Sequence, residues 1–338
     1  MKDIAEALGI SQTTVSHVLP GRDKEFRINA GTASLVRETA ARLDYRPSAI
    51  SRRFKERRSY SVCLAVGDLG NPFWSGLALG AQEAAEKRGY TLVVSHTGES
   101  ADKERRVIEM LRDRRVDGLI LSPVHATSRH LVALQQERLP FVLVDRTIDG
   151  LDVSSVVTDS IAGMGMAVDH LVSRGHRRIA YLGGPADVST FRDRLRGFRQ
   201  AMARNGLEPG LQTKATSDPE AARRAAERLF KRRGSRPTAV VGANLVLTVG
   251  LLRAAPEEVV VVGFDDLYLA DLLRRAVTTV AQPVEELGRR AVDLLLDEIE
   301  AASEGPRRVR RVVLQPRLIE RDERAYVATP TREASRAS

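Results

Sequence analysis

Residues 3–19 read DIAEALGISQTTVSHVL, and this stretch decides the fold of the first part of the chain. Residues 3–8 predict a short amphipathic helix. Gly9 suits the left-handed position that ends a helix, and Ser11 suits the N-cap of a second helix over residues 12–19. Two short helices joined by a glycine-containing turn form a helix-turn-helix, whose second helix enters the major groove of DNA.

The outward face of the second predicted helix carries short polar side chains that suit base edges. Gln12 can pair with adenine, Thr13 can contact a thymine methyl group, and His17 can donate to guanine. Side chains near helix ends are predicted to touch phosphates, so the whole DNA-contacting set in this head is Ser11, Gln12, Thr13, Thr14, Ser16, His17 and Asn29. Taken alone, this window also fits a helical pair in any small bundle.

A third helix and a basic segment follow. Asn29 is the predicted N-cap, and the helix ends at Tyr45-Arg46-Pro47, because the residue before proline disfavours the helical region. Its predicted apolar stripe is Leu35, Val36, Ala40 and Leu43. Residues 48–59 read SAISRRFKERRS, where Pro47 is placed to begin another short helix. A solvated, charged linker is the alternative for this segment.

Positive charge is concentrated at the two ends of the chain. Residues 1–58 carry 12 Lys and Arg against 7 Asp and Glu, and residues 305–338 carry 9 against 4. Residues 59–304 are nearly neutral, with 32 against 33. A basic end commonly meets a polyanion such as nucleic acid.

Composition excludes several classes of protein. The 338 residues are 43% hydrophobic and 29% charged, which is typical of a soluble protein of two or three domains. No apolar run approaches a membrane span, and the N-terminus lacks the layout of a signal peptide. Cys63 is the single cysteine, and the six histidines include no metal-ligand spacing. We therefore expect a cytoplasmic protein with no membrane association and no metal site.

From residue 60 onward, apolar strand-like runs alternate with amphipathic helical segments. The runs include SVCLAVGDLG (61–70), PFVLVDR (140–146), RIAYLGG (178–184) and VVVVGFDD (259–266). Near-continuous apolar strands alternating with helices predict a parallel sheet covered on both faces. Two successive α/β units predict two subdomains, with a ligand cleft where strand carboxyl ends from both meet.

Motifs for catalysis are missing from this body. GMGMAV (163–168) lacks the GxGxxG order, and neither GxxxxGK[ST] nor GxSxG occurs. An enzyme is therefore disfavoured, and no cofactor is predicted.

The head motif, followed by DYRPSAISRRF (44–54), resembles the lactose/galactose repressor (LacI/GalR) family. The resemblance continues through DLGNPFWSGL (68–77), GHRRIAYLGGP (175–185), STFRDRLRGF (189–198) and TTVAQP (278–283), and covers roughly residues 1–322. It implies an N-terminal all-α helix-turn-helix head with a hinge helix, followed by an α/β periplasmic-binding-protein-like core of two Rossmann-like subdomains.

The resemblance also implies a division of the chain. The head is 1–46, the hinge 47–58 and the core 59–322. The N-subdomain is about 59–158 with 283–312, and the C-subdomain about 159–281 with 313–322. Three crossings between subdomains are expected near 157–159, 280–283 and 313–318. The polar remainder, 323–338, is expected to be disordered.

Site residues follow from the resemblance. In this family the paired hinges enter the minor groove and an apolar side chain wedges between base steps. Phe54 matches the wedge, where leucine is usual, and the implied hinge contacts are Ser48, Ala49, Arg52, Arg53 and Phe54. The implied effector pocket contains Phe73, Trp74, Asp145, Arg194, Asn244 and Asp265, which together suit a polyhydroxyl ligand. A sugar is the expected effector, and a nucleobase is the alternative.

The sequence departs from the family pattern at several places. His17 stands where arginine is usual, and Leu245 replaces the usual aspartate after Asn244. The stretch LLRAAPEEVVVVGF (251–264) is also shorter than the family pattern. The first difference implies a change in the preferred bases, and the other two imply that the second subdomain's side of the pocket is altered.

The predicted function is a cytoplasmic, homodimeric transcriptional regulator, most simply a repressor, that binds double-stranded DNA at a near-palindromic operator. Two alternatives remain open. A sugar-binding transport protein shares the body fold, and an enzyme could use the cleft. The helix-turn-helix disfavours the first, and the missing catalytic motifs disfavour the second.

Overall fold

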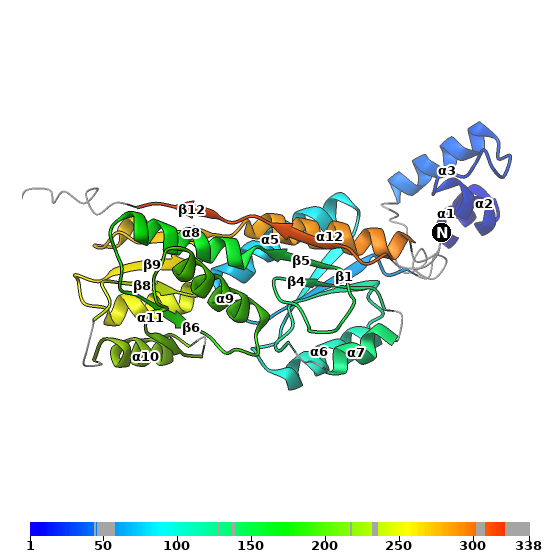
Figure 1. Ribbon diagram of the computed structural model, residues 1–338. Coiled ribbons are helices and arrows are strands. Elements are labelled where there is room, and N and C mark those ends of the chain that lie inside the picture. The colour runs from blue at the N-terminus through cyan, green and yellow to red at the C-terminus, as the bar shows by residue number, and fades with distance from the viewer. Residues whose placement is uncertain are drawn as a thin grey trace, which may run out of the picture. The chain divides into compact units, whose positions relative to one another are not determined.

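A computed structural model describes residues 1–43, 45, 58–126, 129–136, 139–216, 218–231, 236–301 and 308–321. The chain divides into two compact units, Met1–Tyr60 and Ser61–Ser338 (Figure 1). The predicted tail lies outside the described residues, and so do the predicted hinge contacts Ser48, Ala49, Arg52, Arg53 and Phe54.

The first unit contains the predicted helix-turn-helix. Its helices are α1 (Lys2–Leu8), α2 (Gln12–Val18) and α3 (Ala30–Arg42). Gly9 ends α1 with φ 64°, and the hydroxyl of Ser11 accepts the backbone N–H of Thr14 at 3.1 Å. Both local signals thus act as the sequence predicts.

One face of each helix forms the small core of this unit. The fully buried side chains include Ile4, Val15, Val18, Ala33 and Val36. The prediction that Leu35 and Leu43 belong to the apolar stripe of α3 is wrong, because these side chains are 54% and 47% exposed. Positions 33, 36 and 40 share the buried face instead, and each step along a helix turns the side chain by about 100°.

The second unit contains two six-stranded sheets. The first has the order β11-β5-β4-β3-β1-β2 and the second β12-β10-β9-β8-β6-β7. The strands of the first sheet are β1 (Ser61–Val66), β2 (Thr91–His96), β3 (Gly118–Leu121), β4 (Phe141–Val144), β5 (Ser155–Thr158) and β11 (Arg311–Leu314). Those of the second are β6 (Ile179–Gly183), β7 (Gln212–Lys214), β8 (Ala239–Gly242), β9 (Val260–Phe264), β10 (Thr278–Ala281) and β12 (Arg317–Ile319). Every strand pairing is parallel except that of β12 with β10.

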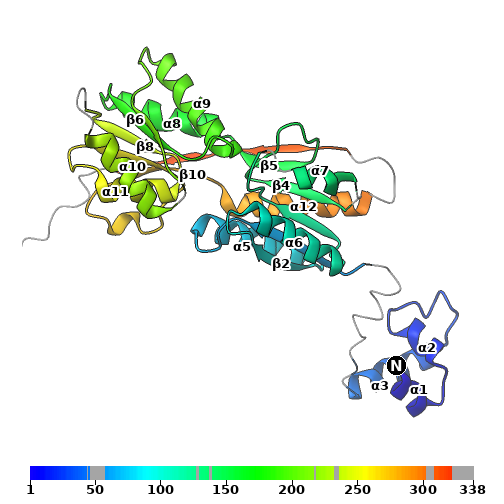
Figure 2. The same ribbon diagram turned by 90° about the horizontal axis from the view of Figure 1, so that it is seen from below.

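The chain crosses between the two sheets three times: after β5, after β10, and between β11 and β12. Figure 2 shows the resulting two lobes, with the β11–β12 segment running from one to the other. Val313 and Leu314, which the sequence-based division gives to the C-subdomain, pair with Val157 and Thr158 of β5 in the first sheet. The last crossing therefore follows Leu314.

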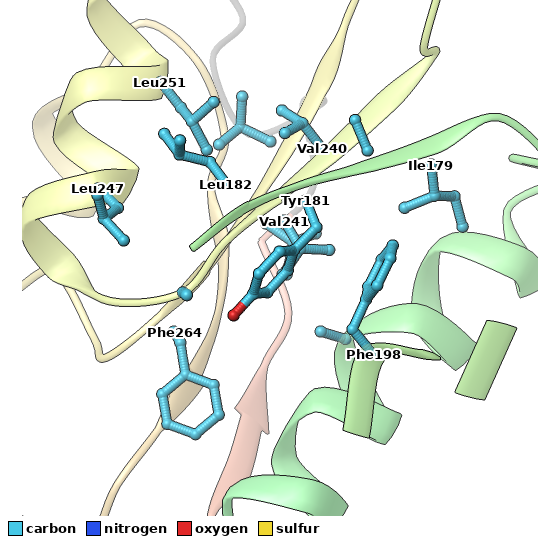
Figure 3. Close-up of a cluster of buried hydrophobic side chains, with 14 of the residues drawn as sticks. Ile179, Tyr181, Leu182, Phe198, Val240, Val241, Leu247, Leu251 and Phe264 are labelled. Atoms are coloured by element: carbon cyan, nitrogen blue, oxygen red, sulfur yellow. The ribbon is translucent and has the colours of Figure 1, made fainter. Parts of the chain in front are cut away.

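Helices cover the faces of both sheets. The first lobe has α5 (Pro72–Lys87), α6 (Ala101–Asp113), α7 (Arg129–Gln136) and α12 (Val284–Ala301). The second has α8 (Ser160–Ser173), α9 (Ser189–Arg204), α10 (Pro219–Lys231), α11 (Leu245–Ala254) and a 3-10 turn, Ala270–Leu272. Among the helices in the described ranges, none is long and apolar enough to cross a membrane. Figure 3 shows the core of the second lobe, where Tyr181, Phe198 and Phe264 fill the space beside the sheet.

Helices α5 and α12 approach each other closely through glycine. A Cβ atom at Gly80 would overlap the carbonyl oxygen of Glu285, and one at Gly288 would overlap that of Leu77. Only glycine permits this contact between backbones. The contact fixes α5, whose first turn carries Phe73 and Trp74.

We expect Gly288→Ala to lower the free energy of unfolding by about 1–3 kcal/mol, because an added methyl group overpacks the α5–α12 contact. The control is Gly165→Ala in α8, where the nearest atom to the new methyl group lies 3.6 Å away. That variant should be neutral or more stable, since alanine favours helices by up to about 1 kcal/mol over glycine. Urea unfolding measures both, and equal stability of the two variants would contradict the packing account.

Candidate functional site

A pocket of about 520 Å³, open to solvent, lies in the second unit. Its lining includes every predicted effector residue: Phe73, Trp74, Asp145, Arg194, Asn244 and Asp265. These side chains come from both lobes: Asp145, Asn244 and Asp265 follow the carboxyl ends of strands, and the other three lie in α5 and α9. The crossings of the chain therefore bring together residues up to 192 positions apart.

Asp145 and Asp265 occupy equivalent places in the two lobes. Asp145 directly follows β4 and Asp265 directly follows β9. Both have left-handed backbones, with φ 64° and 73°, and each donates its backbone N–H to the next strand, to Val156 and Val280, at 2.9 Å. Left-handed conformations cost energy for residues other than glycine and gather at functional sites. The geometry aims both carboxylates into one cleft.

The carboxylate of Asp265 is held by two donors. Gln282 Nε2 donates to Asp265 Oδ1 at 2.6 Å, and the backbone N–H of Leu245 donates to Oδ2 at 3.2 Å. Asn244 uses its side-chain oxygen to cap α11, accepting the N–H of Leu247 at 2.9 Å. Leu245 thus contributes its backbone here, at the position where the family pattern has an acidic side chain.

Arg194 is 3% exposed and is fixed on its inner side. Its Nη1 donates to the carbonyl of Ala243 at 2.7 Å, and its guanidinium lies 3.9 Å from the centre of the Phe264 ring. Within the described residues, Nε has no hydrogen-bond partner. Arg194 also lines the pocket, and a guanidinium whose orientation is fixed suits recognition of a ligand oxygen.

Phe73 and Trp74 lie in the first turn of α5. Asn71 caps this helix by accepting the N–H of Phe73 at 3.1 Å, and Pro72 follows at a position that favours helix initiation. The two rings meet edge to face at 4.7 Å and 81°. They form an apolar wall of the pocket, and the Arg146 guanidinium lies 5.5 Å from the centre of the Trp74 ring.

Sequence reasoning missed several pocket residues, notably Glu99, Arg146 and Gln282. Arg146 donates Nη1 and Nη2 to the two carboxylate oxygens of Glu99 at 2.7 and 2.9 Å. Arg146 and Gln282 follow β4 and β10, and Glu99 stands in the turn after β2. Their positions beyond strand carboxyl ends are the signal that could have found them.

Burial raises the pKa of Asp145 from 3.8 to about 6. The nearby Asp265 and Glu99 carboxylates act in the same direction, while Arg194 and Arg146 oppose the rise. Asp145 therefore takes up a proton in the mildly acidic range.

Contacts between the lobes lie beside the pocket. Arg192 of α9 donates to both carboxylate oxygens of Asp149 at 2.5 and 2.8 Å. His125 Nδ1 lies 2.9 Å from Asp187 Oδ2, and the N–H of Thr147 donates to the hydroxyl of Ser189 at 2.9 Å. These polar contacts define the relative position of the two lobes at the cleft.

In the head, some of the predicted DNA-contacting residues are exposed, and others make contacts within the head. Gln12 and Thr13 are exposed on α2. The hydroxyl groups of Thr14 and Ser16 bond internally, to Ser11 Oγ at 2.9 Å and to the carbonyl of Thr13 at 2.8 Å.

Two more of these residues have internal contacts of their own. His17 stacks on Phe26 with ring centres 3.6 Å apart and an angle of 16°. The side chain of Asn29 caps α3 by accepting the N–H of Gly31 at 2.7 Å.

Comparison with known proteins identifies the family. Residues 59–316 match the family described as periplasmic binding proteins and sugar binding domain of LacI family. The ribose operon repressor of Escherichia coli (strain K12) is 33% identical over 332 residues, which cover 95% of this chain and 98% of that protein. The chain belongs to the LacI family.

Two solved structures of regulators match over nearly the whole chain. The Lac repressor dimer bound to operator and the anti-inducer ONPF has a TM-score of 0.81 and 25% identity, covering 94% of this chain and 96% of that one. The transcriptional regulator CelR in complex with cellobiose has a TM-score of 0.71 and 29% identity, covering 94% and 97%. This LacI-family chain is thus a ligand-modulated, DNA-binding repressor in its overall design.

We expect Asp145→Asn to gain stability relative to the parent chain as pH rises from about 4 to 7. A raised carboxyl pKa means that ionisation disfavours the folded state, so the stability present below pH 3.8 is lost as pH rises through about 6. The rise in pKa corresponds to about 3 kcal/mol at most. Urea unfolding at several pH values measures the difference between the variant and the parent.

The control should show no such dependence on pH. The hydrogen bond from the Arg192 guanidinium lowers the pKa of Asp149 below its usual value of 3.8. The stability that ionised Asp149 contributes is present above pH 3.8 and is lost only as pH falls below it, so the difference in unfolding free energy between Asp149→Asn and the parent should stay nearly constant from about pH 4 to 7. A difference in unfolding free energy between Asp145→Asn and the parent that stays constant across this range would contradict the raised pKa of Asp145.

Proposed function

We propose that this chain is a cytoplasmic repressor that binds a near-palindromic operator as a homodimer and changes its affinity when a sugar occupies the pocket. One observation carries the proposal: a helix-turn-helix and a two-lobed pocket containing the six expected effector residues occur in one chain. The role of the pocket is binding rather than catalysis, in keeping with relatives named as repressors.

In this proposal α2 reads the major groove. Gln12 and Thr13 contact base edges, because their side chains are exposed at the start of the helix. His17 contributes through the edge of a ring whose face rests on Phe26. Ser11, Thr14, Ser16 and Asn29 lie near phosphates, and the hinge residues Ser48, Ala49, Arg52, Arg53 and Phe54 enter the minor groove.

The pocket favours a sugar over a nucleobase. Asp145 and Asp265 are acceptors for ligand hydroxyl groups, and Arg194 and the side-chain amide of Asn244 are donors. Phe73 and Trp74 supply the apolar wall on which a sugar ring can rest. The solved complex of CelR with cellobiose, a relative of the same fold, supports this choice.

Exposed apolar side chains on both lobes support the homodimer. In the first lobe they are Leu79 of α5 with Val93 and Val94 of the edge strand β2. In the second, Tyr268, Leu269 and Leu272 are 76%, 48% and 76% exposed. Groups of exposed apolar side chains mark interaction surfaces, and a two-fold dimer matches a palindromic site.

Selection of DNA by the full-length protein at fixed salt should recover a near-palindromic site, because two heads related by two-fold symmetry read two half-sites. Gln12→Ala and Thr13→Ala should each weaken binding to that site by about 1–3 kcal/mol, or roughly 5- to 150-fold. Ser34→Ala, exposed on α3, serves as the control and should bind like the parent. Enrichment of no sequence by a folded sample would contradict the proposal.

Leu272→Glu should shift the protein from dimer to monomer, since a charge at the centre of an apolar interface loses its hydration. Met110→Glu on α6, another exposed apolar position, is the matched control and should leave the dimer intact. Sedimentation equilibrium gives both masses. A dimer as stable as the parent's in the Leu272 variant would remove this surface from the interface.

A further inference from the structure

Phe26 is an exposed aromatic residue beside the DNA-reading face proposed for α2. It is 43% exposed, and its ring stacks on the imidazole of His17 with ring centres 3.6 Å apart and an angle of 16°. His17 and Thr13 are four positions apart on α2, so their side chains lie on one face of the helix. Phe26 therefore extends the face that carries Thr13 and His17.

The loop that carries Phe26 is fixed by contacts to both neighbouring helices. The backbone N–H of Arg22 donates to the carbonyl of His17 in α2 at 3.0 Å, and the N–H of Phe26 donates to the carbonyl of Arg22 at 3.2 Å. On the other side, Nη2 of Arg37 in α3 donates to Asp23 Oδ1 at 2.6 Å. The position of the Phe26 ring is thus set within the folded head.

Charged side chains of the same loop surround this ring. The guanidinium of Arg22 lies 4.9 Å from the centre of the Phe26 ring, within the range of a cation–π contact, and it donates to both carboxylate oxygens of Glu25 at 2.7 and 2.5 Å. Lys24 and Arg27 are exposed, and Arg27 has a left-handed backbone with φ 54°. Such backbones gather at functional sites, and exposed cations suit the phosphates that flank a groove.

The stack presents two ring edges to the same side. Nδ1 of His17 is buried and has no hydrogen-bond partner within the described residues, so a base can approach this imidazole only at another part of its edge. With centres 3.6 Å apart and nearly parallel planes, the two rings overlap and their edges lie side by side. Neighbouring base pairs are about 3.4 Å apart along the DNA axis, so the two edges fit two neighbouring pairs.

We propose that Phe26 contacts the 5-methyl group of a thymine in the base pair next to the one that His17 contacts. The proposal rests on the operator-binding function given to the head above. A phenyl ring offers base edges no hydrogen bond of the kind that distinguishes guanine, adenine or cytosine, whereas thymine presents an apolar methyl group in the major groove. The head therefore prefers thymine at this position.

The first test uses the site recovered by DNA selection with the full-length protein. Each thymine is replaced in turn by deoxyuridine in both half-sites, which removes only the methyl group, and fluorescence anisotropy at fixed salt gives the Kd. A thymine whose methyl group has no effect on binding by Thr13→Ala is assigned to Thr13. At one other thymine, the replacement should weaken binding by the parent about 4-fold per half-site, as expected for one buried methyl group.

The outcomes of this test separate the inference from the function on which it rests. If no thymine methyl group affects binding by the parent, or only the one assigned to Thr13, the inference is overturned and the recovered site still supports the DNA-binding function. Failure to recover any site contradicts that function itself. This test needs no variant of Phe26, so it remains decisive if a substitution in the loop destabilises the head.

The second test repeats the measurements with two variants of Phe26. In Phe26→Ala the deoxyuridine replacement at the assigned position should have no effect, while the effect at the thymine assigned to Thr13 should persist. Phe26→Leu keeps an apolar side chain and should retain part of the effect. A Phe26→Ala protein in which deoxyuridine still weakens binding about 4-fold would show that Phe26 only supports His17, and would overturn the inference.

Lys24→Ala, in the same loop, is the matched control. Loss of a phosphate contact should weaken binding to every DNA of the set by a similar factor and reduce the dependence on salt. The pattern across the thymines should match that of the parent. If Lys24→Ala abolished the methyl effect as Phe26→Ala does, the effect would depend on the fold of the loop rather than on the ring, which would contradict the proposal.

Discussion

The placement of two buried carboxylates, Asp145 and Asp265, constrains the rest of the core. Both lie at strand carboxyl ends with left-handed backbones, and they face the same cleft from different lobes. Like charges in a shared, poorly solvated site repel each other, so Arg146 and Arg194 must lie beside them. The crossings after β5 and β10 bring these groups together, and the glycine contact between α5 and α12 fixes the aromatic wall next to them.

Binding in such a site is coupled to the relative position of the two lobes. Asp145 and Arg146 come from the first lobe, and Arg194 and Asp265 come from the second, so a ligand that contacts all four favours a particular separation. Two polar contacts at the edge of the cleft, Asp149 with Arg192 and His125 with Asp187, also join the two lobes. Exposed pairs of this kind contribute little individually, and the differential contacts of the ligand must supply most of the coupling energy.

Local patterns predicted much of this structure. The helix-turn-helix followed from Gly9 and Ser11, whose roles depend on neighbouring residues only. The alternating strands and helices predicted two parallel sheets, and the family resemblance placed all six effector residues at one pocket.

Contacts between distant loops were not predictable in this way. The Glu99–Arg146 pair joins turns after β2 and β4, and His17 meets Phe26 through a loop without a regular pattern. Leu35 was misplaced because small alanines at positions 33 and 40 take the buried face of α3.

The central claim is that this pocket and the DNA-binding head are energetically linked. It is tested most directly by measuring operator affinity across a titration with the sugar that binds, and sugar affinity with and without operator DNA. The account predicts that saturating sugar changes the operator Kd by about 5- to 150-fold, and that operator DNA changes the sugar Kd by the same factor. A sugar that occupies the pocket while the operator Kd stays constant would contradict it.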